Sequence, residues 1–228
     1  MIKLFEEYND FNTFCKKYIS GTTTINSDGS IDVDGSVCLY GLKLTKIPYK
    51  FGRVTGEFDC SDNKLTSLEG CPRYTYDFYC SDNKLLKSLE GGPEEVVRLF
   101  SCPSNGLLSL KGAPKVVGGS FVCSGNKLTS LKGAPMIIGM ALDCSNNQLT
   151  TLEGAPKEFG GSFHCNLNPL PNIIIINLFY IKDILRYQDD YSIWNRDGSL
   201  NEYRFNDMME EIRIEGRREK EIRRLEND

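Results

Sequence analysis

The sequence contains an internal repeat with a mean period of 21 residues. The segment from Phe58 to Gly70, FDCSDNKLTSLEG, recurs almost unchanged from Phe121 to Gly133 as FVCSGNKLTSLKG. A short self-similar period is typical of a solenoid, in which each copy forms one turn and packs only against its neighbours. The repeat therefore predicts a stack of similar turns.

Cysteine marks one position of the repeat, and an imperfect first copy has a leucine there. The intervals between these residues are 21, 20, 22, 21, 21 and 21. An apolar, mostly aromatic residue comes two positions earlier, asparagine three positions later and leucine five positions later. The four columns are Leu39, Cys60, Cys80, Cys102, Cys123, Cys144 and Cys165; Val37, Phe58, Phe78, Phe100, Phe121, Leu142 and Phe163; Asn63, Asn83, Asn105, Asn126, Asn147 and Asn168; and Leu44, Leu65, Leu85, Leu107, Leu128, Leu149 and Leu170.

Each column has a physical role if one copy is one turn. The Phe-x-Cys pair has the two-residue spacing of a short strand with one face inward. Asparagine follows where the chain leaves the strand, and a buried amide there can bond to backbone groups that the strand no longer pairs. The remainder of each copy, such as Leu131–Pro135, is rich in glycine and proline. We therefore expect the chain to return as extended backbone rather than as a helix.

The segment Val117–Leu128 fits the LxxLxLxxNxL pattern, with its first apolar position shifted by one residue. The chain resembles a leucine-rich repeat protein of the short bacterial class found in secreted Yersinia and Shigella effectors. The chain is most similar to uncharacterised leucine-rich repeat proteins of tailed bacteriophages, on the basis of its consensus motif Cys-Ser-x-Asn-x-Leu-Thr-Ser-Leu-x-Gly-Ala-Pro. The resemblance covers residues 34 to 170.

We therefore predict an α/β fold: a leucine-rich repeat solenoid of about seven turns of ~21 residues, with short parallel strands on a concave face and a non-helical convex side. Helical caps are expected at both ends. The predicted boundaries are 1–36 for an N-terminal helix and hairpin, 37–170 for the repeats, and 171–228 for a C-terminal helical cap and charged tail.

The flanking segments support these caps. Apolar residues fall at helical spacing from Leu4 to Tyr18, and Gly21 lies where a helix would stop. Asp28-Gly29 predicts a hairpin turn before the first copy. The stretch from Ile173 to Trp194 is the most apolar part of the chain, and the charged residues after it predict a solvated helix that frays near Gly216.

The composition indicates where in the cell the protein is expected and which classes of ligand it is not expected to bind. Twenty-seven basic and 31 acidic side chains give a net charge of −4, and the mean hydropathy is −0.33. This balance lacks the basic excess that nucleic-acid binding needs. Acids occupy the start of the chain where a signal peptide would be apolar, and no apolar run is long enough for a membrane span. We expect a cytoplasmic protein, in the cytoplasm of the bacterial host if a phage encodes it, that does not bind membranes.

The nine cysteines raise the question of metal or disulfides. The sequence contains no CxxC pair, and a linear column of six thiols cannot bring four ligands to one metal ion. We predict buried, reduced thiols and neither a metal nor a cofactor, with disulfides or a metal site as the alternatives. Cys15, Cys38 and Cys71 lie outside the column, and Cys38 is expected to point outward.

Outward positions beside the cysteine column supply the candidate contact residues. Residues 57 to 82 hold six acids and two bases, a net charge of −4 that equals the charge of the whole chain. The predicted partner-binding residues are Glu57, Asp59, Asp62, Asp77, Tyr79, Asp82, Asp143 and His164. Two interpretations remain open: an acidic patch that docks a basic protein surface, or acids that only keep an edge-rich sheet soluble.

These observations predict a noncatalytic protein–protein interaction module that binds through its concave face, and not an enzyme. No nucleophile, base and orienting group converge in the repeats, and His164 fits a contact residue better than a catalytic one. The phage resemblance implies an accessory protein that binds and inhibits a host protein, such as one of antiviral defence. The alternative is a structural or self-associating phage protein, with subunits paired through the cap aromatics or the charged tail.

Overall fold

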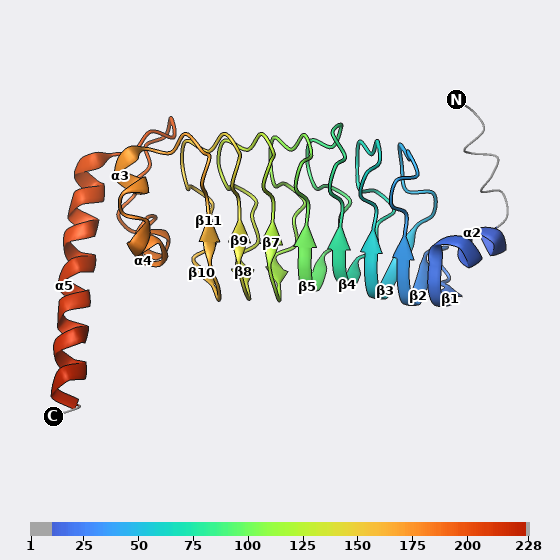
Figure 1. Cartoon of the computed structure of the whole chain (residues 1–228), viewed down its shortest axis with the longest axis horizontal. Helices are drawn as coiled ribbons and strands as arrows, with labels where there is room; N and C mark the ends of the chain where they lie inside the picture. Colours follow the sequence, from blue (N-terminus) through green and yellow to red (C-terminus); the bar gives the residue numbers. More distant parts are fainter. Residues whose placement is uncertain (1–10, 227–228) are drawn as a thin grey trace.

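The computed structural model describes residues 11–226. Its strands and their connections form a β-solenoid of about six turns of ~21 residues, not the predicted seven. Figure 1 shows the turns side by side along the long axis of the molecule. One eleven-stranded sheet runs through the stack. Its strands are β1 (Ile19–Ile25), β2 (Ile31–Cys38), β3 (Phe51–Asp59), β4 (Tyr74–Tyr79), β5 (Glu95–Ser101), β6 (Val116–Val117), β7 (Phe121–Val122), β8 (Ile137–Ile138), β9 (Leu142–Asp143), β10 (Glu158–Phe159) and β11 (Phe163–His164).

Successive turns pair in parallel, and the repeat columns lie in register. Phe58 pairs with Phe78, which pairs with Phe100 and then Phe121, so one aromatic ring stands above the next. The ring centroids are 5.9, 5.0 and 5.2 Å apart along this row. The connections between β2 and β11 contain no helix, as the glycine and proline content predicts.

The predicted inward columns are confirmed. All six cysteines of the column are buried, and so are the aromatic column up to Leu142 and the asparagines from Asn63 to Asn147. Phe163, in the last turn, is half-buried. The sheet and the returning segments therefore enclose one continuous row of apolar side chains.

The leucine column is wrong at one position. Leu85 is 53% exposed, whereas Leu86 is fully buried. This copy is one residue longer than the mean, and the extra residue is accommodated after Asn83, whose carbonyl accepts the Leu86 N–H at 2.9 Å. Leu86 therefore occupies the core position of this turn, and Leu85, the extra residue, lies at the surface.

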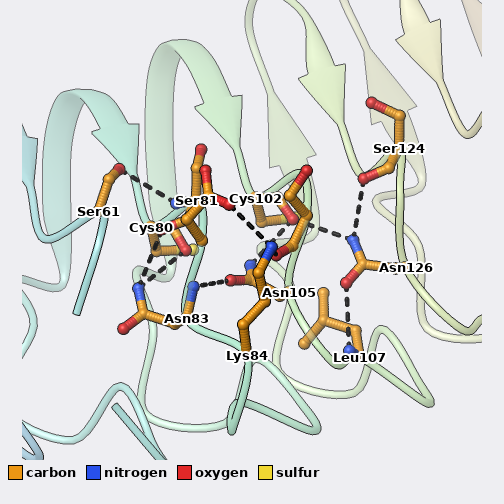
Figure 2. Close-up of polar contacts among 12 residues, drawn as sticks. Ser61, Cys80, Ser81, Asn83, Lys84, Cys102, Asn105, Leu107, Ser124 and Asn126 are labelled. Carbon is orange, nitrogen blue, oxygen red and sulfur yellow. Dashed lines mark hydrogen bonds and ion pairs between the residues drawn. The ribbon is translucent and has the colours of Figure 1, made fainter. Parts of the chain in front are cut away.

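The buried asparagines tie each turn to the one before it. The Asn126 amide nitrogen donates to the carbonyl oxygens of Cys123 in its own turn and Cys102 in the preceding turn, both at 3.0 Å. Its Oδ1 accepts the backbone N–H of Leu107 at 3.1 Å, as Figure 2 shows. The same three kinds of bond recur at Asn63, Asn83, Asn147 and Asn168. Asn105 differs, because its Oδ1 accepts the N–H of Asn83, beside the inserted residue.

The N-terminal end contains the helix and hairpin that the sequence predicts. Helix α2 (Phe11–Tyr18) buries Phe14, whose ring lies 4.6 Å from Tyr49, and β1 pairs antiparallel with β2. The expected helical residues before Phe11 lie outside the described residues. Gly21 is not a helix stop: it lies within β1 opposite Gly35, where a Cβ would be 2.0 Å from the Asp34 carbonyl oxygen.

The C-terminal segment is helical after Pro171. It contains α3 (Asn172–Ile175), the 3-10 turn η1 (Leu178–Tyr180), α4 (Ile181–Tyr187) and α5 (Glu202–Glu226). Helix α5 buries Phe205, Met208, Met209 and Ile212. The expected fraying near Gly216 is wrong, since α5 continues through it; one exposed glycine costs a helix only about 1 kcal/mol.

Substitution of the two adjacent leucines tests the register in the longer copy. Leu86→Ala should lower the free energy of unfolding by about 2–5 kcal/mol, because it leaves a cavity in a closed row. Leu85→Ala is the matched control and should change it by less than about 0.5 kcal/mol, because the side chain is at the surface. Chemical denaturation measures both, and equal losses would contradict the assignment of Leu86 to the core.

Candidate partner-binding face

Outward side chains of the strands form one face of the solenoid, the face predicted to be concave, which we call the strand face. Val54 and Phe58 of β3 are buried, and the residues that alternate with them point away from the core. Neighbouring parallel strands are about 4.8 Å apart, so side chains of successive turns lie next to one another on this face. Each repeat contributes a few contact positions to a continuous surface.

Three acids of the predicted set form what we call the acidic row: Glu57, Asp59 and Asp62. Glu57 and Asp62 are exposed, and Asp59 is half-buried. Asp59 Oδ1 accepts the backbone N–H of Ser61 at 2.8 Å. Within residues 11–226, none of the three carboxylates forms an ion pair. The acidic row therefore retains its negative charge toward solvent.

The structure corrects the prediction for Asp77, which is only 4% exposed. Its carboxylate accepts the Arg98 Nε–H at 3.0 Å and the Leu99 N–H at 2.9 Å, and it pairs with the Arg98 guanidinium through its second oxygen. This copy is one residue shorter than the mean, and its inward side chains, Thr75 and Phe78, are three residues apart where other turns have four. The shorter strand draws Asp77 into the sheet, so Asp77 is a structural residue.

Asp82 and Tyr79 lie in the same part of the face. Asp82 Oδ1 is 2.8 Å from Lys84 Nζ, so its charge is compensated. Desolvation raises the pKa of the Tyr79 hydroxyl, and the nearby carboxylates of Asp77 and Glu57 raise it further. Tyr79 therefore remains a neutral hydrogen-bond donor beside the acidic row.

Asp143 and His164 are brought together by the structure, but away from the other predicted residues. They are register partners in β9 and β11. His164 lies five strand spacings, roughly 24 Å, from Asp59 along the face. Both line a shallow groove of about 440 Å³ whose other walls are serines, asparagines and Gly125. His164 Nε2 is 2.8 Å from the Ser162 hydroxyl. The predicted set is thus two separate groups.

The cysteine column is buried: five of its six side chains have no exposed surface, and Cys165 is 6% exposed. None of the nine cysteines forms a disulfide, and Cys38 is exposed as predicted. Burial raises the pKa of the column thiols well above the ordinary value at Cys80, Cys123 and Cys144, and to about 11 at Cys165. Among the residues that the structure describes, no group of three or more His, Cys, Asp or Glu side chains could hold a metal ion.

Two further residues shape this face, and the repeat columns do not single them out. Arg98 supplies the cation that neutralises Asp77, and nothing in the repeat columns distinguishes it. Asp34 is exposed one turn before Glu57, with its carboxylate accepting the Thr55 hydroxyl at 2.8 Å. The sequence could have identified Asp34 as an outward residue, because it lies between Val33 and Val37, two apolar residues that are buried.

Comparisons of the chain with protein-family models, with curated proteins and with solved structures find no match. Among the described residues, no helix has the length and apolar character needed to cross a membrane.

Thiol reactivity tests the burial of the cysteine column. In native protein near pH 8, Ellman's reagent should react fast with Cys38, and the column thiols should react only after unfolding, because burial keeps them protonated. Cys38→Ser should remove most of the fast phase, whereas Cys123→Ser should leave it unchanged. Fast reaction of six or more thiols in native Cys38→Ser protein would contradict a closed core.

Two charge reversals on this face should differ in their effect on stability. Asp77→Lys should lower the free energy of unfolding by about 3–5 kcal/mol, because it places a second cation against Arg98 in a buried position. Glu57→Lys should change it by less than about 0.5 kcal/mol, since the Glu57 side chain is exposed and an exposed charge contributes little. Thermal and chemical denaturation compare them, and an unchanged Asp77→Lys protein would rule out a structural ion pair.

Proposed function

We propose that this protein is a noncatalytic binding module whose acidic row docks a basic surface of a partner protein. The observation that carries the proposal is that Glu57 and Asp59 project from the sheet and Asp62 from the turn after β3, all without ion-pair partners among residues 11–226. Because the sheet already holds these carboxylates in place, a partner would lose little conformational entropy in meeting them. Complementary charge would speed association and select basic partners.

Tyr79 is the central contact in this proposal. It follows Asp59 in the next strand and is half-buried beside Glu57. Tyrosine is enriched among residues that dominate binding energy, because it combines apolar area with a hydroxyl donor. Arg98 and Lys84 neutralise Asp77 and Asp82, so the negative potential is concentrated on the acidic row.

The proposal includes the leucine-rich repeat identity and the absence of catalysis. Parallel strands, buried asparagines and helix-free returns support that identity, and the buried Phe14 and Ile174 support the terminal helices as caps. His164 has the Ser162 hydroxyl as its hydrogen-bond partner on an exposed surface, which fits a contact role. If the phage resemblance holds, the partner is a bacterial host protein, for example one of antiviral defence.

Affinity capture from bacterial lysate tests this function. Immobilised wild-type protein should retain a partner that Glu57→Lys with Asp59→Lys fails to retain. The matched control, Glu158→Lys with Asp190→Lys, makes the same change in net charge at exposed acids of the C-terminal part and should retain it.

The captured partner then allows a direct measurement. Its affinity should fall at least about tenfold with the double reversal, and should weaken as salt rises from about 0.05 to 0.5 M. A partner that binds the Glu57→Lys, Asp59→Lys variant as tightly as wild type would show that the acidic row serves only solubility.

A further inference from the structure

The charges of α5 are separated onto two sides of the helix. The acidic side carries four acids, Asp207, Glu210, Glu211 and Glu215, against one base, Arg218. Two of these acids accept hydrogen bonds from the hydroxyls of Tyr187 and Tyr191. The basic side carries Arg213, Arg217 and Lys220, whose spacing of four and three residues places them in one line.

The basic side faces a groove of about 490 Å³ between α5 and the η1–α4 segment, which we call the basic groove. Its lining includes four cations, the three above and Arg223, against two carboxylates, Asp183 and Glu219. Within residues 11–226, Arg213, Arg217 and Lys220 form no ion pair: Arg213 contacts the Asn177 amide, and Arg217 donates to the Arg213 carbonyl.

A large aromatic side chain lies open at this groove. Phe179 is 91% exposed, and its ring lies edge-on to that of Tyr180 with the ring centroids 5.2 Å apart. Ile176, nearby in the chain, is 78% exposed. Exposed apolar side chains next to unpaired cations are typical of a protein-binding surface rather than of a solvated one. The occupant that fits must offer carboxylates together with an aromatic or apolar contact.

The acidic row supplies this chemistry. Its carboxylates form no ion pair among the described residues, and Tyr79 adjoins them. Glu57 and Asp59 are two residues apart on a strand, about 7 Å. Arg213 and Arg217 are four residues apart on a helix, about 6 Å. The two spacings allow two ion pairs to form together.

The two surfaces cannot meet within one copy. Figure 1 shows α5 at one end of the stack, while β3, which carries the acidic row, lies toward the other end. Each copy therefore presents one surface of each kind. When two copies meet through one such contact, one surface of each kind remains free at the ends, so further copies can add.

We propose that copies of this protein associate head to tail, with the basic groove of one copy binding the acidic row of the next. This inference rests on the proposed function, because it names a second copy as a partner of the acidic row. The arrangement provides a structural protein whose assembly competes with any other basic ligand of that row.

Sedimentation velocity over a range of protein concentrations tests the proposal. Wild-type protein at low salt should form species larger than a dimer as concentration rises, and about 0.5 M salt should dissociate them because these charges lie at the surface. Arg217→Glu with Lys220→Glu, and separately Glu57→Lys with Asp59→Lys, should each weaken association at least about tenfold. The Glu158→Lys, Asp190→Lys protein should associate like wild type.

Mixing the two weakened variants gives the decisive result. The reversed groove of one variant is complementary to the reversed row of the other, and the unreversed surfaces remain complementary as well. An equimolar mixture should therefore assemble at concentrations where each variant alone is monomeric. Thermal melts of both variants check that they remain folded.

Several results would overturn the inference. Wild-type protein that stays monomeric, association that neither reversal weakens, or a mixture that fails to assemble would each do so. Sedimentation with phosphatidylcholine vesicles containing phosphatidylserine adds a further one: a monomeric protein that binds these vesicles through Arg217 and Lys220 would assign the groove to anionic membranes. Loss of the lysate partner in the row-reversed variant, with a monomeric wild type, would retain the proposed function and reject head-to-tail assembly.

Discussion

The structure depends on how the backbone groups at the end of each short strand find hydrogen-bond partners. A buried carbonyl or N–H without a partner costs about 1–3 kcal/mol, and a solenoid repeats this problem in every turn. One asparagine per turn solves it, since a side-chain amide donates and accepts at once. Asn126 does so for Cys102, Cys123 and Leu107, and thereby joins two turns with a single side chain. Stability and register therefore come from the same contact.

Because the buried residues stabilise the fold, the outward residues of the strand face can vary with little loss of stability. Core rows and asparagines hold the backbone, so the outward positions carry little of the folding energy. Glu57 and Asp77 illustrate the limit of that freedom. They occupy the same position of the repeat and are register partners in β3 and β4, yet Glu57 is exposed and Asp77 is buried against Arg98. A length difference of a single residue between copies decides which role the carboxylate takes.

The two ends of the solenoid carry surfaces of opposite charge. The acidic row lies toward the N-terminal end, and the cations of the basic groove project from the C-terminal helix. A net charge of −4 conceals this separation, because α5 carries acids on its other side. Surfaces of opposite sign at opposite ends suit a protein that binds a basic partner, another copy of itself, or each in competition.

Sequence periodicity alone determined the repeat, the inward rows, the parallel stacking and the helix-free returns, because one local solution recurs in every turn. It also predicted the hairpin at Asp28-Gly29 and the exposure of Cys38. Tertiary structure decided the exceptions: which leucine of Leu85 and Leu86 is buried, and the burial of Asp77. These outcomes depend on how neighbouring turns absorb an extra or a missing residue and on packing by distant segments. The sequence of one repeat does not specify how it packs against adjacent turns. Only the contacts between turns in the folded protein could decide these exceptions.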